Sequence, residues 1–129
     1  MAIGSALVLL ACSTAPAVHT SPPQPRDETR QWSTTILLHG KPLELHLSKP
    51  RTPVTADVLV LYASGDGGWF GAAVDMFRQI GRNGYLAVGF SSRAFLKIER
   101  PHGVLVTAAD LSDEYEQILK AARADMGLG

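Results

Sequence analysis

The sequence predicts an α/β fold in which an antiparallel hairpin is followed by a strand, a helix, a strand and a second helix. Leu43, Leu45 and Leu47 alternate with polar residues, and this period of two marks a strand with one buried face. The run 58–63 is continuously apolar, as in a central parallel strand covered on both faces. Apolar residues at helical spacing and a second apolar run follow it, which is the pattern of a βαβ unit.

Composition limits the classes of function. The chain has 129 residues, 46% of them hydrophobic, which is enough for one modest core. Twelve basic and twelve acidic residues give zero net charge, so nucleic acid is not expected as a partner. The single cysteine excludes an internal disulfide and a Cys-rich zinc site, and the four histidines lack metal-ligand spacing. We expect no metal and no cofactor.

Residues 1–12 have the pattern of an export signal. Their second half ends in Leu-Leu-Ala-Cys, which resembles the lipobox where bacterial signal peptidase cleaves before a lipidated cysteine. Cys12 is therefore the predicted lipid-attachment residue of a periplasmic, membrane-anchored protein. No Lys or Arg precedes Cys12, so we expect a truncated start or an upstream initiation codon. Residues 13–30 are rich in Ser, Thr and Pro and are predicted to form a disordered tether before a folded part at 31–129.

The predicted hairpin has strands at 32–38 and 42–48. His39-Gly40 supplies its turn, and Pro50 and Pro53 break the chain after it. The βαβ unit then contains the apolar strand 58–63, a helix at 70–82 and a strand at 85–90. The helical residues expected to face the sheet are Ala73, Phe77 and Ile80, and Asn83-Gly84 is the expected helix stop.

A polar turn and a loop are predicted after the second parallel strand, extending through Pro101. The final helix is expected at 107–126, because Thr107 and Asp110 have capping-box spacing. Its buried face is predicted to contain Leu111, Tyr115, Ile118 and Ala122. These strands are too few for a doubly covered sheet. We therefore expect an N-terminal part of a larger domain, with an unpaired strand edge beside 58–63.

The sharpest chemical signal is the glycine-rich segment 64–69, Ser-Gly-Asp-Gly-Gly-Trp. A turn of this kind between a strand and a helix exposes backbone N–H groups that bind anions. It lacks the Gly-Lys-Ser/Thr ending of a P-loop, and with Gly71 it reads G-x-G-x-x-x-G rather than the dinucleotide fingerprint G-x-G-x-x-G. The charge of Asp66 and the bulk of Trp69 also disfavour a pyrophosphate. A third possible use of such a loop is half of an oxyanion hole, as in an α/β-hydrolase.

This motif after an apolar strand resembles the signature of the VirJ/AcvB-type bacterial virulence proteins, and the similarity continues through 84–93 to the helix at 107–126. The resemblance implies an α/β-hydrolase-like three-layer sandwich, of which this chain holds an incomplete N-terminal part. It also implies hydrolysis of acyl esters, on an aminoacylated phospholipid at the cell envelope. The amides of Asp66 and Gly67 would then be the oxyanion donors.

The catalytic residues of such a hydrolase are not in this sequence. No G-x-S-x-G elbow occurs, so the nucleophile, acid and histidine are expected beyond Gly129, and the chain alone is expected to be inactive. Ser64 has no evident base and is not expected to be a nucleophile. The histidines are expected at the surface: His19, His39, His46 and His102.

The candidate site therefore consists of the loop and the turn after the next strand. The loop residues are Ser64, Gly65, Asp66, Gly67, Gly68 and Trp69. We expect Asp66 to cap the following helix or to shape the loop, with substrate contact as the alternative, and Trp69 to pack as a lid over the loop. Ser91, Ser92 and Arg93 either face a substrate cleft at the carboxyl ends of the strands or form an ordinary turn.

Two other functions stay open. One is an NADP-binding Rossmann-type unit, in which Ser92-Arg93 would bind the 2′-phosphate. The other is a non-catalytic envelope lipoprotein. The expected partners of the favoured hydrolase are an envelope lipid or acyl-ester substrate and, through Cys12, the membrane. A G-x-S-x-G soon after Gly129 in the reading frame would favour the hydrolase.

Overall fold

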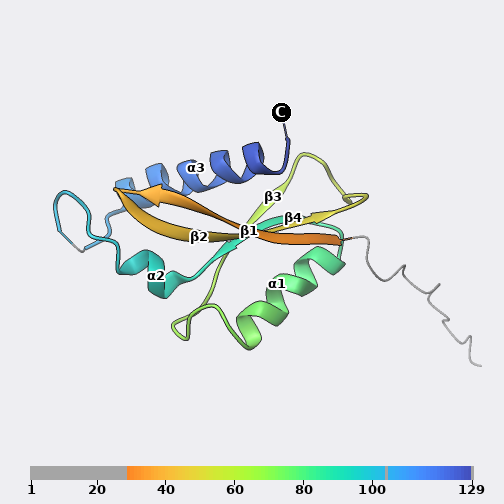
Figure 1. The fold of residues 1–129 in the computed structure, drawn as a ribbon, viewed down its shortest axis with the longest axis horizontal. Helices are drawn as coiled ribbons and strands as arrows, with labels where there is room; N and C mark the ends of the chain where they lie inside the picture. The colour runs from red at the N-terminus through yellow and green to blue at the C-terminus, as the bar shows by residue number, and fades with distance from the viewer. Residues whose placement is uncertain (1–28, 104, 129) are drawn as a thin grey trace, which may run out of the picture.

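The computed structural model describes residues 29–103 and 105–128 of the chain. Cys12, the predicted signal at 1–12 and most of the predicted tether lie outside the described residues. The described part is a mixed sheet of four strands with helices on both faces, which confirms the α/β class (Figure 1). The strands are β1 (Thr29–Leu38), β2 (Lys41–Pro50), β3 (Leu59–Ala63) and β4 (Leu86–Phe90), in the spatial order β1-β2-β4-β3.

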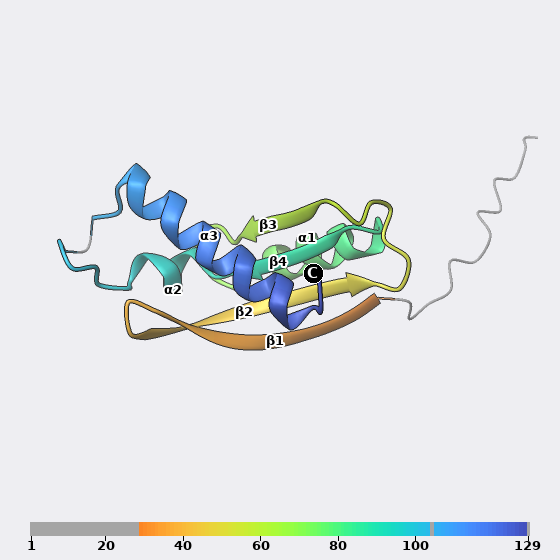
Figure 2. The same ribbon diagram turned by 90° about the horizontal axis from the view of Figure 1, so that it is seen from above.

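Three helices surround this sheet. α1 (Ala72–Arg82) covers one face, and α3 (Ala108–Asp125) crosses the other face (Figures 1 and 2). The short α2 (Ser92–Leu96) lies at the end of the sheet where β3 and β4 terminate. Among the described residues, no helix is both long enough and apolar enough to span a bilayer.

The predicted hairpin is confirmed, with longer strands than the sequence indicated. β1 and β2 pair antiparallel from Thr29–Pro50 to Leu38–Lys41. His39 and Gly40 form the two-residue turn, and both have positive φ, 51° and 74°. Two positive φ values define a type I′ turn, whose twist matches that of paired strands.

β4, rather than β3, is the central strand of the sheet. All five residues of β4 are buried, because it pairs parallel with β3 on one side and antiparallel with β2 on the other. The prediction that the run 58–63 is covered on both faces is wrong. β3 pairs with β4 alone among the described strands, and Leu59–Tyr62 are only half-buried. The expected unpaired edge beside this strand is present in the described sheet.

The helices differ from the predictions in three places. α1 begins at Ala72 rather than Phe70, and its N-cap is Gly71, with φ 57°. The loop predicted through Pro101 is wrong at its start, because α2 forms there with the Ser91 hydroxyl accepting from the amide of Ala94 at 3.2 Å. The third difference, on α3, is a buried glutamate.

α3 begins with the predicted capping box, in which the Thr107 hydroxyl and the Asp110 carboxylate bond each other's amides. Its predicted apolar face is directed at the sheet, with Ile118 and Ala122 fully buried and Leu111 and Tyr115 half-buried. Glu114 lies on the same face and is also buried. The core that α3 covers is mainly aliphatic: Leu38, Leu43, Leu45, Leu47, Leu86, Val88 and Ile118.

Candidate functional site at the glycine loop

The glycine loop, residues 64–71, connects β3 to α1 at the carboxyl end of the parallel strands. Its tip is a tight turn closed by the amide of Gly68, which donates to the carbonyl of Gly65 at 3.1 Å. Gly67 is not among the residues with positive φ, which is consistent with a type I turn with Asp66 and Gly67 at its centre. The amides of these two central residues donate to no group of the described residues. The loop thus presents two adjacent N–H donors at an exposed tip.

Trp69 fixes this loop to the sheet. Its indole stacks on the imidazole of His46 in β2, with ring centroids 4.1 Å apart and planes 2° apart. It also meets Phe77 of α1 edge-on at 5.1 Å. The space that it fills is available only because residue 89 is glycine, since a Cβ there would overlap the indole. Trp69 therefore packs beneath the loop, against the sheet, rather than over the loop as a lid.

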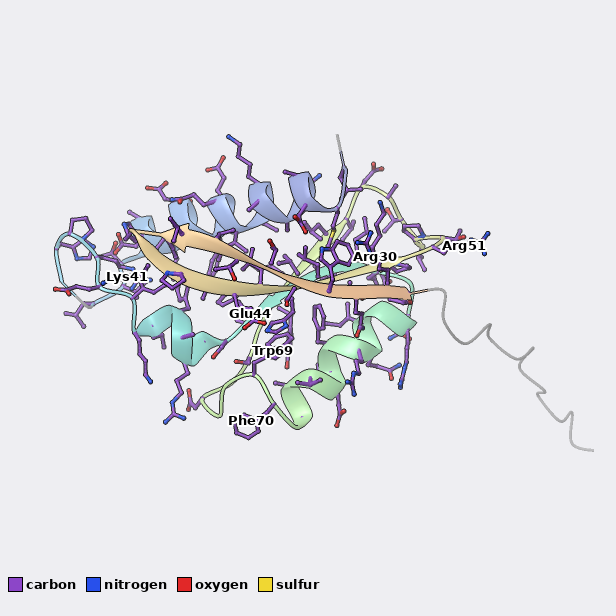
Figure 3. All side chains as sticks on the ribbon, viewed as in Figure 1. Arg30, Lys41, Glu44, Arg51, Trp69 and Phe70 are labelled. Carbon is purple, nitrogen blue, oxygen red and sulfur yellow. The ribbon has the colours of Figure 1, made fainter. Side chains whose placement is uncertain are left out.

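His46 is part of the packing around Trp69, whereas the sequence analysis expected this histidine at the surface. Its side chain is 22% exposed and is covered by Trp69. This burial lowers the pKa of His46, and Glu44, whose carboxylate lies 3.9 Å away, raises it in part. Figure 3 labels Glu44 and Trp69, the residues on either side of His46 in this arrangement. An imidazole kept neutral in this way stacks on the indole without the cost of a buried charge.

Ser64 has a structural position. It is 3% exposed, and its hydroxyl accepts from the amide of Ser92 at 3.1 Å. Its own amide donates to the carbonyl of Phe90 at 3.0 Å. No histidine of the described part contacts its hydroxyl, so nothing there could take the proton of a nucleophile. Ser64 ties the start of the glycine loop to the start of α2.

Asp66 does not cap the following helix. The N-cap of α1 is Gly71, with no side-chain cap, and Asp66 is exposed at the tip of the turn. Five residues, 67–71, separate Asp66 from the first residue of α1, so its carboxylate is not at the helix terminus. The role left from the sequence analysis is to shape the turn, for which Asp is well suited, or to contact a ligand.

The segment after β4 lies beside the glycine loop, as the parallel strands require. Ser91 caps α2, and a Cβ on Gly68 would lie 3.8 Å from its hydroxyl. Ser92 donates to Ser64, and Arg93 is exposed on α2. The structure therefore brings 91–93 to the loop, with both serines used in local hydrogen bonds and Arg93 projecting to solvent.

Phe70 is a residue of this loop that sequence analysis assigned to the following helix. It lies outside α1, is 68% exposed, and its ring lies beside the turn, 3.8 Å from a Cβ built on Gly67. Figure 3 shows its ring directed away from the sheet. The signal in the sequence was a phenylalanine directly after the glycine-rich motif. Because Trp69 already fills the space against the sheet, Phe70 is left exposed in the loop.

A group of charged and polar side chains, away from the glycine loop in the sequence, holds the segment after α2 in place. Glu114 of α3 is 1% exposed and accepts from Nε of Arg100 at 3.0 Å. Nη2 of Arg100 lies 2.8 Å from the other oxygen, in ion-pair range but poorly directed for a hydrogen bond. His39, in the hairpin turn, lies 3.2 Å from the same carboxylate. The remaining described histidine, His102, lies 2.7 Å from the Asp110 carboxylate, which already bonds Thr107.

These histidines do not form a metal centre or a triad with the loop. The described residues contain no group of three His, Cys, Asp or Glu side chains that could hold a metal ion. A groove on α3, lined in part by Leu119 and Leu128, lies on the helix that covers the opposite face of the sheet from α1.

Comparisons of the chain with protein-family models, curated protein sequences and solved structures give no significant match. The candidate site therefore rests on its own geometry.

Proposed function

We propose that the glycine loop is the oxyanion-binding element of a serine hydrolase of the α/β-hydrolase type, acting on acyl esters. The observation that carries this proposal is the pair of adjacent amides, of Asp66 and Gly67, that donate to no described group. Two preorganised N–H donors are what a developing oxyanion requires. Trp69 supports the proposal because it holds the loop rigidly on the sheet, so that the donors need no reorganisation during the reaction.

The chemistry assigned to this loop is stabilisation of charge. When a serine oxygen attacks the ester carbonyl, its proton passes to a base and the carbonyl oxygen becomes an anion that accepts from both amides. Collapse of this intermediate releases the alcohol, and water then releases the acid. The described residues supply no nucleophile and base, and the unpaired edge of β3 is where a further strand bearing the serine would pair.

The substrate class in this proposal follows from the resemblance of the segment 64–69 to the VirJ/AcvB-type virulence proteins. It is an acyl ester of an aminoacylated phospholipid, hydrolysed at the periplasmic side of the envelope by a protein held through lipid on Cys12. Metabolic labelling with a fatty-acid analogue tests the anchor. Label is expected on the wild-type protein, and equal labelling of Cys12→Ser would contradict it.

A pair of substitutions at Asp66 tests the oxyanion role. Asp66→Pro removes one N–H donor, and proline is favoured at this position of a type I turn. Asp66→Ala removes the carboxylate and keeps the donor. The protein, with any sequence that its reading frame adds after Gly129, is assayed on p-nitrophenyl esters. Asp66→Pro is expected to lower kcat by about 10²–10³, and Asp66→Ala only a few fold. Equal effects of the two substitutions, or no hydrolysis by the wild type, would overturn the proposal.

The NADP-binding alternative is favoured by one observation, the exposed side chain of Arg93 on α2, which follows Ser92, whose amide bonds the first residue of the glycine loop. Calorimetry with NADPH separates the two functions. The hydrolase proposal expects no saturable binding, whereas binding that Arg93→Ala abolishes would establish the nucleotide site. Absence of both hydrolysis and NADPH binding would favour a non-catalytic envelope lipoprotein.

A further inference from the structure

β1 forms the margin of the sheet opposite β3, and no other described strand pairs with its outer side (Figure 2). It pairs with β2 from Thr29–Pro50 to Leu38–Lys41 in a continuous register, without a bulge. Natural proteins shield an exposed edge strand from other chains with lysine, proline or a bulge. Residues 31–38 contain no charged residue, no proline and no glycine. The outer edge of β1 therefore lacks these protections.

The hairpin turn fixes which backbone groups of β1 face outward. In a two-residue turn the flanking residues, here Leu38 and Lys41, form a hydrogen-bonded pair, and such pairs alternate along the two strands. Pro42 and Pro50, which have no N–H to donate, both fall on the intervening positions and agree with this alternation. The residues of β1 whose N–H and C=O groups face away from β2 are therefore Gln31, Ser33, Thr35 and Leu37.

The side chains of β1 alternate between two environments. Trp32 and Ile36 pack on the α3 side against the core and are half-buried at the margin of the sheet. The side chains of the four residues with outward backbone groups belong to the other face and are all exposed, Leu37 to 70%. A further strand beside β1 would therefore satisfy the outward backbone groups and complete the cover of two apolar side chains.

We propose that β1 pairs antiparallel with β1 of a second copy of the chain, about a two-fold axis at Thr34, so that the two sheets become one. In this register Ser33 lies opposite Thr35 of the second copy, and Gln31 lies opposite its Leu37. All four residues have outward N–H and C=O groups, so each opposite pair exchanges two hydrogen bonds. The contact is closed, because both copies use the same strand.

Self-complementarity favours a second copy over another extended segment. With the axis at Thr34, Trp32 of one copy lies opposite Ile36 of the other on the α3 side. Aromatic and β-branched residues in such positions form stabilising cross-strand pairs. Because the contact is two-fold, this pair forms twice, and every outward group of 31–37 is used on both copies.

Charges do not oppose this contact. Residues 31–37 carry none, so no like charges lie directly opposite each other. The closest like pair of the two hairpins joins Arg30 of one copy and Lys41 of the other, two strands or about 10 Å apart, which is a Debye length. Asp125 accepts from the Trp32 indole at 2.6 Å and offsets Arg30, which lies over the same ring at 4.4 Å.

Proline at position 35 tests the backbone pairing, in the full chain with Cys12→Ser to remove lipidation. Thr35→Pro deletes an outward N–H and breaks no bond inside the hairpin, as edge strands allow. Sedimentation velocity over a dilution series is expected to show a reversible dimer of the background protein. Thr35→Pro should raise its dissociation constant about tenfold or more, because a two-fold contact loses two hydrogen bonds. Thr35→Val keeps the amide and is the matched control, expected to dimerise as the background does.

Exchange of charges tests the register. Gln31→Lys with Leu37→Lys places lysines opposite each other twice in the dimer, and Gln31→Glu with Leu37→Glu does the same with glutamates. Each variant alone is expected to dimerise about tenfold more weakly. An equimolar mixture is expected to recover a dimer with one copy of each, which added salt should weaken. Recovery requires residue 31 to lie opposite residue 37, so a folding defect cannot imitate it.

Three results would overturn the proposal. The first is a monomer at every concentration, and protection of the Ser33 and Thr35 amides from hydrogen exchange would then show that a segment of the same chain covers β1. The second is equal dissociation constants for Thr35→Pro and Thr35→Val, which would place the contact at another surface, such as the edge of β3. The third is a mixture of charge variants that associates no better than its components. Association is measured without substrate and leaves the edge of β3 free, so its failure is distinct from a failure of the oxyanion proposal.

Discussion

Two side-chain clusters hold the segments that leave the parallel strands, and they use different chemistry. The first, which we call the Trp69 cluster, consists of Trp69, His46 and Phe77 on the α1 face and fixes the glycine loop. The second, the Glu114 cluster, consists of Glu114, Arg100 and His39 on the α3 side and fixes the segment between α2 and α3. One is an aromatic stack and the other a buried ion pair.

The difference decides how each cluster fails. A buried ion pair is costly to break by removing one partner, because the remaining charge stays in a low-dielectric environment. An aromatic stack loses only contact and buried area when one ring is changed, but its close packing makes it sensitive to added volume. We therefore expect the Glu114 cluster to dominate stability and the Trp69 cluster to control the position of the loop.

The largest effect is expected from Arg100→Met, which leaves Glu114 buried and unpaired. Urea denaturation should show a loss of about 3–5 kcal/mol in the free energy of unfolding. Adding Glu114→Leu should restore much of this loss, since no buried charge then remains. Lys120→Met, at an exposed cation, is the control. A double variant no more stable than Arg100→Met would show that the charges are not what makes this cluster costly to break.

Gly89→Ala should have the next largest effect, because its methyl group overlaps the indole of Trp69. The expected loss is about 1–3 kcal/mol, with a shift of the Trp69 fluorescence as the ring moves. Trp69→Leu should make the same alanine nearly harmless, which is a test of coupling between the two sites. Gly65→Ala is the control, since a Cβ there meets nothing within 4 Å. Strictly additive effects at 89 and 69 would contradict the close packing.

His39→Asn should cost about 1 kcal/mol by removing the bond to Glu114. Asparagine tolerates the positive φ of this position, so the turn itself is preserved. His39→Ala should cost more, because it loses both the bond and this tolerance. The measurement is the urea midpoint. Equal midpoints for the two variants would mean that backbone strain at the turn contributes nothing.

The smallest effect is a pH dependence from the Trp69 cluster. Burial lowers the pKa of His46 in the folded state, so below its ordinary value of about 6.5 the unfolded chain binds the proton more readily. Folding stability from this group is therefore complete above pH 6.5 and falls as the pH decreases from there. His46→Phe keeps a ring on the indole and removes the titration. Its melting temperature should fall less between pH 7.5 and 5 than that of the wild type, and parallel curves would contradict the assignment.

The hairpin, the βαβ unit and the capped final helix could be predicted because each has a local signal. Alternation marked the hairpin strand, and Thr107 with Asp110 marked the start of α3. α2 was missed because a helix of five residues is too short to show periodicity, although Ser91 is a good N-cap. The unpaired edge of β3 could be expected from the small number of strands, but its partial exposure could not, since an apolar run does not specify how completely its two faces are covered.

The site shows the same limit. The amides of Asp66 and Gly67 follow from the glycine-rich turn itself, which is a local feature. The contacts of Trp69 do not, because they depend on His46 and Gly89, which come from other strands. Glu114 occupies a position on the predicted apolar face of its helix, and its partners lie 14 and 75 residues away in the chain. No pattern along the sequence connects residues at such distances.

The antiparallel junction between β2 and β4 gives the sheet an internal seam. β2 pairs with β1 along ten residues, but with β4 only through His46–Gly89, Leu47–Val88 and Ser48–Ala87. The half of β2 nearest the turn, 41–45, has β1 as its backbone partner in the sheet, and α3 packs across the hairpin. Local opening that lifts the hairpin tip therefore breaks no bond between β3 and β4. In hydrogen exchange, the amides of the tip will exchange as a unit ahead of those in β4, and under force the sheet will part into two ribbons along this seam.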